Sequence, residues 1–190
     1  MYHLALVLFV CWAITLSALT FQRSKVWNNS LVLWTDVLHK FPGTQRGLIN
    51  RGNALFDLGS YQDAIRDYNI VLAKNMADES AYINRGRAKA NIGDLQGAIS
   101  DFSICTRLAP RDYLPFYNLG ILYALTGDKM QSYAAFSGSI QINPEYAEAY
   151  YYRAQISIDL GNKEQMCLDY RTALNLGYEP AAAALQRYCR

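Results

Sequence analysis

The sequence has 190 residues, enough for one ordinary domain and an appendage, with 52% hydrophobic residues, 18% charged residues and a net charge of +2. Its basic residues do not gather in runs, which argues against nucleic acid as a partner. Four cysteines without a C-x-x-C spacing and two histidines cannot form a structural zinc site, so we expect no metal and no cofactor.

An uncharged stretch opens the chain, from Leu4 to Phe21, and the basic residues Arg23 and Lys25 follow it. As a helix this stretch would be about 27 Å long, close to the ~30 Å of a bilayer's hydrocarbon core. We therefore expect residues 1–27 to form an apolar helix and residues 4–21 to anchor the chain in a membrane. A cleaved signal peptide and an apolar helix docked on the rest of the chain are the alternatives.

The rest of the chain repeats with a period of 34 residues. A glycine recurs at this spacing at Gly59, Gly93, Gly127 and Gly161. A small residue recurs at Gly52, Gly86, Gly120 and Ala154. An aromatic residue recurs at Tyr68, Phe102, Phe136 and Tyr170. This period with these residue types resembles the tetratricopeptide repeat (TPR), in which each repeat is a pair of antiparallel helices.

The resemblance implies an all-α, right-handed solenoid with four repeats. The repeats would span residues 45–78, 79–112, 113–146 and 147–178. Residues 28–44 have the phase of a second helix and would form a half-repeat, and residues 179–190 would form a capping helix. Within each repeat, the glycine at the end of the first helix is expected in the left-handed conformation, and the small residue should let the second helix approach closely.

Two charged positions vary together among the repeats. Three repeats carry an arginine and an aspartate 16 residues apart, as Arg51/Asp67, Arg85/Asp101 and Arg153/Asp169. The third repeat has Leu119 and Ala135 there, so both charges are missing at once. We therefore expect an Arg–Asp ion pair that bridges the two helices, because the planar guanidinium meets a carboxylate with two hydrogen bonds.

In TPR arrays the first helices line a groove that holds a peptide, and the resemblance places part of this sequence in it. The implied groove residues are Asn50, Asn53, Asn84, Arg87, Asn118, Tyr117, Tyr151 and Gln155. An asparagine in successive repeats can read a peptide backbone, because its carboxamide offers both donors and an acceptor. The alternative is that these asparagines are only solvated.

Cys167 and Cys189 lie eleven residues either side of Tyr178, so an antiparallel hairpin could bring them opposite one another. A disulfide needs an oxidising compartment and suitable Cβ directions. We favour two buried thiols at these positions.

No catalytic constellation is visible, so we expect a scaffold that binds a peptide or protein partner at a membrane, and no enzyme activity. Gln22 to Trp27, with Trp34 and Pro42, also resemble the junction in polytopic membrane glycosyltransferases of the O-mannosyltransferase type. There a last transmembrane helix runs into extracytoplasmic TPR repeats. This resemblance implies an extracytoplasmic array, and as the alternative function a non-catalytic C-terminal portion of such an enzyme.

Overall fold

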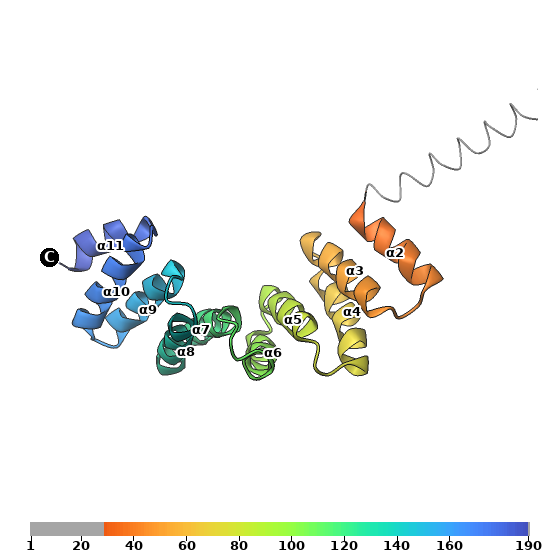
Figure 1. Ribbon diagram of the computed structural model, residues 1–190, viewed down its shortest axis with the longest axis horizontal. Helices are drawn as coiled ribbons and strands as arrows, with labels where there is room; N and C mark the ends of the chain where they lie inside the picture. The colour runs from red at the N-terminus through yellow and green to blue at the C-terminus, as the bar shows by residue number, and fades with distance from the viewer. Residues whose placement is uncertain (1–28, 190) are drawn as a thin grey trace, which may run out of the picture. The chain divides into compact units, whose positions relative to one another are not determined.

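A computed structural model describes residues 29–189, and within them it contains ten α-helices and no strand (Figure 1). The expected all-α fold is confirmed. The chain divides into two compact units, Met1–Lys74 and Asn75–Arg190. The apolar helix expected over residues 1–27, and the membrane anchor within it, lie outside the described residues. In the part that is described, no helix has the length and apolar character needed to cross a membrane.

The described part of the first unit consists of three helices (Figure 1), α2 (Ser30–Lys40), α3 (Gln45–Asp57) and α4 (Tyr61–Lys74). The carboxamide oxygen of Asn29 accepts a hydrogen bond from the backbone N–H of Val32 and so caps the start of α2. Helix α3 packs against both α2 and α4. Leu48 and Tyr68 are buried in this unit and belong to its core.

The second unit contains the remaining helices, and each packs against the next along the chain (Figure 1). They are α5 (Glu79–Asn91), α6 (Leu95–Leu108), α7 (Leu114–Thr126), α8 (Lys129–Ile142), α9 (Ala147–Asp159), α10 (Lys163–Asn175) and α11 (Pro180–Tyr188). We call α3, α5, α7 and α9 the first helices, and α4, α6, α8 and α10 the second helices.

The turn between α7 and α8 follows from two adjacent residues. Gly127 ends α7 with a φ of 84°, a left-handed conformation that favours glycine. The next residue, Asp128, caps α8 by accepting a hydrogen bond from the N–H of Gln131 at 3.1 Å. The expected left-handed conformation is confirmed at all four glycines, Gly59, Gly93, Gly127 and Gly161.

Close packing of the two helices explains the recurring small residue on the first helix. A Cβ added to Gly120 would lie 2.6 Å from Cε1 of Phe136 on α8. The corresponding distance from Gly52 to Cε1 of Tyr68 is also 2.6 Å. Such separations are far below van der Waals contact, so the aromatic ring occupies the space that a larger residue would need.

The C-terminal helix α11 packs on α10 and buries Ala181 completely. A disulfide joins Cys167 on α10 to Cys189 at the end of α11, with the two Cα atoms 5.7 Å apart. Our preference for two buried thiols was therefore wrong. The hairpin brings the two residues within the Cα separation that a disulfide needs.

Candidate functional site

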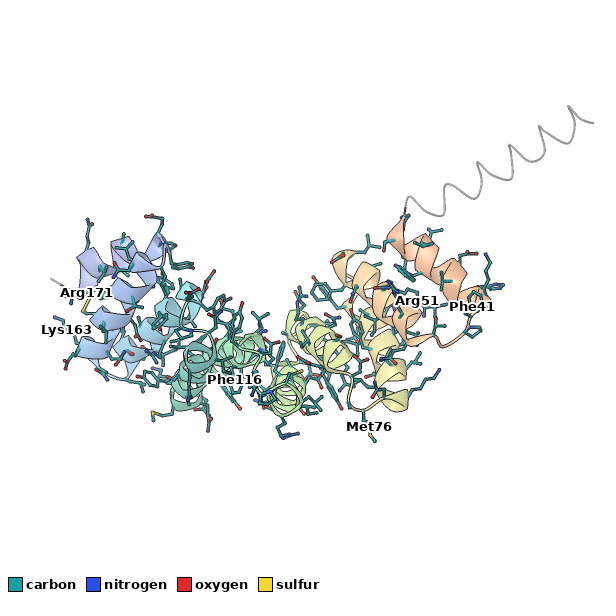
Figure 2. All side chains as sticks on the ribbon, in the orientation of Figure 1. Phe41, Arg51, Met76, Phe116, Lys163 and Arg171 are labelled. Atoms are coloured by element: carbon teal, nitrogen blue, oxygen red, sulfur yellow. A yellow bond between two sulfur atoms is a disulfide. The ribbon has the colours of Figure 1, made fainter. Side chains whose placement is uncertain are left out.

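The structure brings together each arginine and aspartate that vary as a pair. Arg51, labelled in Figure 2, donates from Nε and from one terminal nitrogen to the two carboxylate oxygens of Asp67, at 2.7 and 2.6 Å. In the second unit, Arg85 binds Asp101 in the same way, at 2.9 and 2.7 Å. Arg153 binds Asp169 at 2.8 and 2.7 Å. Each pair links the two helices of a repeat.

These aspartates are buried, and their exposed fractions are at most 3%. Neighbouring side chains add donors to two of them. Lys89 Nζ lies 3.0 Å from Asp101, and Gln165 Nε2 donates to Asp169 at 2.8 Å. Buried carboxylates need such partners, because an unpaired charge is costly away from water.

The arginine pKa values respond to this arrangement. The hydrogen bond to Asp67 raises the pKa of Arg51, although partial burial acts in the opposite direction. Burial lowers the pKa of Arg153, but the hydrogen bond and charge of Asp169 outweigh it, and the pKa is raised overall. Both guanidiniums therefore stay charged, as ion pairs that hold helices together require.

The third repeat shows what replaces the ion pair. Leu119 on α7 and Ala135 on α8 are both buried, in a cluster that also contains Phe102. Two apolar side chains thus stand where the other repeats have the ion pair, and no unpaired charge is buried at these two positions. The joint change of these two positions has a direct physical cause.

The three asparagines expected in the groove lie on first helices and are half-buried. Asn50 belongs to the first unit, and Asn84 and Asn118 belong to the second. The Nδ2 group of Asn118 donates to the carbonyl of Leu114, one turn earlier on the same helix, at 2.9 Å. This bond uses one amide hydrogen of Asn118, and the second amide hydrogen and the oxygen are not used by it.

Three other expected groove residues differ in their surroundings. The Oδ1 atom of Asn53 accepts a hydrogen bond from the hydroxyl of Tyr68 at 2.8 Å, so Asn53 serves the packing of its own repeat. Arg87 on α5 is exposed, and so is Gln155 on α9. These two side chains are accessible from solvent, whereas the oxygen of Asn53 is already used.

The expected groove tyrosine Tyr117 is built into an aromatic cluster. Its ring lies 5.0 Å from that of Tyr146 and 5.8 Å from that of Phe136, measured between centroids. Burial, followed by the proximity of Tyr146 and Tyr152, raises the pKa of its hydroxyl. Tyr117 therefore contributes chiefly to packing between α7, α8 and α9.

Tyr151 meets a second set of rings, at the C-terminal end of the second unit. Its centroid lies 5.5 Å from that of Tyr170 and 5.0 Å from that of Tyr178. Burial also raises the pKa of Tyr170 to about 12. Tyr151 also lines a cavity.

This cavity, which we call the α9–α11 cavity, has a volume of about 520 Å³. It is lined by Tyr151, Gln155, Ile158, Asp159, Tyr170, Pro180, Ala183, Ala184, Arg187 and Tyr188. Its volume falls within the range of roughly 300–1,000 Å³ typical of ligand sites, and aromatic rings with a few polar groups are their usual lining. Two of the expected groove residues, Tyr151 and Gln155, thus meet at one concave site.

The α11 side of this cavity was not predicted from the sequence. The signal was present in the run Ala181 to Ala184, whose small side chains cannot fill the space beside α9. Arg187 was missed as well. This residue was assigned to the capping helix, which was expected only to cover the core and not to line a binding site.

The arrangement of helix pairs defines the TPR fold, and comparisons with solved structures show the same fold. A crystal structure of MamA matches with a TM-score of 0.76 at 21% identity, over 85% of this chain and 94% of that chain. MamA from Desulfovibrio magneticus RS-1, residues 41 to the end, matches with a TM-score of 0.73 at 18% identity, over 85% and 91%. A thermophilic TPR protein of Thermus thermophilus matches with a TM-score of 0.65 at 18% identity, over 88% and 95%.

The sequence itself matches the family described as tetratricopeptide repeat over residues 147–176. This segment contains α9 and α10 and therefore one wall of the α9–α11 cavity. A search of curated protein sequences gives no match. The comparisons thus identify the fold and the repeat, and the resemblance to O-mannosyltransferase-type enzymes stays a prediction.

Proposed function

We propose that this chain is an interaction scaffold that binds a peptide or protein partner on the exposed side of its first helices. The observation that carries the proposal is the α9–α11 cavity, because Tyr151 and Gln155 were both expected to face a ligand and both line it. Ion pairs and aromatic packing hold the helices of the repeats together. Tyr151 stays half-buried and Gln155 exposed, so a ligand can reach both side chains.

Half-buried asparagines on the first helices support the same proposal in each unit. The candidate peptide-binding asparagines are Asn50 in the first unit and Asn84 and Asn118 in the second unit. A carboxamide on a surface can accept from one peptide N–H and donate to one peptide carbonyl, which suits an extended chain of any sequence. Specificity would then come from the side chains that enter the cavity.

The disulfide supports a place for the repeats outside the cytoplasm. Disulfides persist in oxidising compartments and are rare in the cytosol, and Cys167 and Cys189 form one here. We propose that the repeats face such a compartment, with residues 4–21 as the membrane tether. Alkaline carbonate extraction of cell membranes, compared between the full chain and a variant without residues 4–21, tests the tether.

Peptide binding can be tested without knowing the natural partner. The full chain, held in a mild detergent, is used to select binders from a random peptide library, and the best binder is measured against variants. We expect the double change Asn84→Ala/Asn118→Ala to weaken it at least tenfold. The matched control, Asn175→Ala, removes an exposed asparagine from the second helix α10 and should leave affinity unchanged.

The proposal fails if no library peptide binds above background. It also fails if the double change and the Asn175→Ala control affect the selected peptide equally.

A further inference from the structure

Two pairs of aromatic rings with nearly the same geometry occur in the second unit, one repeat apart. Tyr117 and Phe136 have centroids 5.8 Å apart and planes at 59°. Tyr151 and Tyr170, 34 residues further on, have centroids 5.5 Å apart and planes at 58°. The two pairs therefore present nearly the same surface to the helix that packs next to them.

In the first pair, the following helix α9 supplies a third ring. Tyr152 stacks on Phe136 with a centroid separation of 6.0 Å and an interplanar angle of 15°. It also meets Tyr117 edge-on at 6.0 Å. Offset-stacked and edge-on contacts are the preferred aromatic geometries, so the ring of Tyr152 completes this cluster.

The helix that follows the second pair is α11, and its contacts show how it corresponds to α9. Tyr146 approaches Tyr117 at 5.0 Å just before α9, and Tyr178 approaches Tyr151 at 5.0 Å just before α11. Three residues after each of these tyrosines, Ala149 and Ala181 are completely buried. By this correspondence, Ala184 stands where α9 has Tyr152.

With alanine at that position, the described residues of α11 place no ring against Tyr151, and the α9–α11 cavity opens between Tyr151, Tyr170 and Ala184. Tyr188 stacks on Tyr170 at 6.5 Å, but no ring contact joins it to Tyr151 in the described part of the chain. Tyr188 thus takes the stacked place that Tyr152 has one repeat earlier, and the edge-on place beside Tyr151 and Ala184 is open.

The two charged residues that line the cavity, Asp159 and Arg187, differ in whether they have an ion-pair partner. Asp159 already pairs with Lys129, at 3.3 Å. The guanidinium of Arg187 lies 5.2 Å from the centre of the Tyr188 ring and pairs with no carboxylate among residues 29–189. An occupant with a negative group next to an aromatic group would therefore match both features.

We propose that the α9–α11 cavity binds an aromatic side chain from an acidic segment of the partner, in the open edge-on place beside Tyr151 and Ala184. The ring packs against Tyr151 beside Ala184, and an adjacent carboxylate pairs with Arg187. This inference rests on the proposed function, since it names the chemistry of the segment that the scaffold binds.

Short synthetic peptides test the inference directly. The full chain, with 13C-labelled alanine methyl groups and in detergent micelles, is titrated with acetyl-Glu-Tyr-Glu-amide and followed by NMR. We expect the methyl signals of Ala183 and Ala184 to shift. Replacing the peptide's tyrosine with alanine should weaken binding at least tenfold, and replacing both glutamates with lysine should weaken it severalfold.

A variant of the protein that fills the cavity complements the changes made in the peptide. Ala184→Tyr places a ring in the open position beside Tyr151, so we expect it to abolish binding of the tyrosine peptide and to maintain or raise the melting temperature. Gln186→Tyr is the control, because it adds the same ring at an exposed position of α11 outside the cavity. Should Ala184→Tyr not fold, Arg187→Glu serves instead, and it should make the lysine peptide the better ligand.

Equal effects of the tyrosine and alanine peptides on the alanine methyl groups would overturn the inference, as would unchanged binding to Ala184→Tyr. If the cavity fails these tests while library-selected peptides still depend on Asn84 and Asn118, this inference is wrong and the proposed function stands. If no peptide of either kind binds, both are wrong.

Discussion

Arg51 and Asp67 are joined by two hydrogen bonds, of 2.7 and 2.6 Å, that connect α3 to α4. The side chain of Asp67 is 4% exposed and that of Arg51 is 28% exposed, so the carboxylate is the deeply buried partner. Loss of the arginine would strand a buried charge, whereas loss of both groups would leave an apolar contact such as that of Leu119 and Ala135.

This asymmetry gives the first prediction. Arg51→Leu should lower the free energy of unfolding by about 3 kcal/mol, because it leaves Asp67 buried without its partner. Arg51→Leu with Asp67→Ala should recover most of that loss, since it reproduces the pair found in the third repeat. Urea unfolding of the native chain, of each single variant and of the double variant measures the difference, and a double variant as unstable as the sum of both single changes contradicts the account.

A second prediction compares two ion pairs. Asp101 has Lys89 as a second cation at 3.0 Å, so Arg85→Leu should cost less than Arg51→Leu. Lys89→Ala alone should cost little, and combining it with Arg85→Leu should cost more than the sum of the two. A thermal melt of each variant measures this coupling, and strict additivity would show that Lys89 does not compensate.

The disulfide gives a third prediction. Closing a loop over a separation of 22 residues should stabilise the fold by about 3 kcal/mol through the unfolded chain. Reducing agent should therefore lower the melting temperature of the native chain. The Cys167→Ser/Cys189→Ser variant should melt at that lower temperature with or without reductant. If iodoacetamide labels Cys167 and Cys189 in the unreduced, unfolded chain, the bond is absent.

A fourth prediction concerns alkaline pH. Burial raises the pKa of Tyr170 to about 12, above the ordinary value of 10. A raised pKa means that the folded state disfavours the phenolate, so this stability is fully present below pH 10 and is lost as the pH rises through about 12. Tyr170→Phe removes the ionisable group and keeps a ring that Phe102 and Phe136 show to be compatible with this position.

Denaturant unfolding at pH 8 and pH 11.5 measures that effect. The native chain should lose about 1 kcal/mol more between the two values than Tyr170→Phe does, after allowance for solvent screening. An equal loss in both proteins would show that Tyr170 ionises as freely in the folded state as in the unfolded state.

Much of the local structure could be predicted from the sequence because it depends on single residues at a fixed spacing. Left-handed glycines such as Gly127 define the turns, and small residues such as Gly120 face a ring on the next helix. The Arg–Asp pairs were visible because both members change together in the third repeat. Each of these features is contained within one 34-residue unit.

The features that were missed depend on where the repeat ends. Asn143, directly after α8, has an extended conformation, whereas α10 is followed by Gly177 with a φ of 89°. The chain therefore enters α11 differently, and α11 corresponds to α9 through a shift of 32 residues, as the pairs Tyr146/Tyr178 and Ala149/Ala181 show. A fixed period of 34 could not predict the cavity beside Ala184, whereas the approach of Cys189 to Cys167 could be expected from the hairpin at Tyr178 and only the bond between them was not favoured.

The central claim is that a partner peptide binds on the first helices of the second unit. Photo-crosslinking tests it most directly, with benzoyl-phenylalanine placed at Gln155 on the first helix α9 or at Leu168 on the second helix α10, both exposed positions. A library-selected peptide should crosslink strongly at position 155 and at background level at position 168. Crosslinking at position 168 alone, or equally at both positions, would contradict the account.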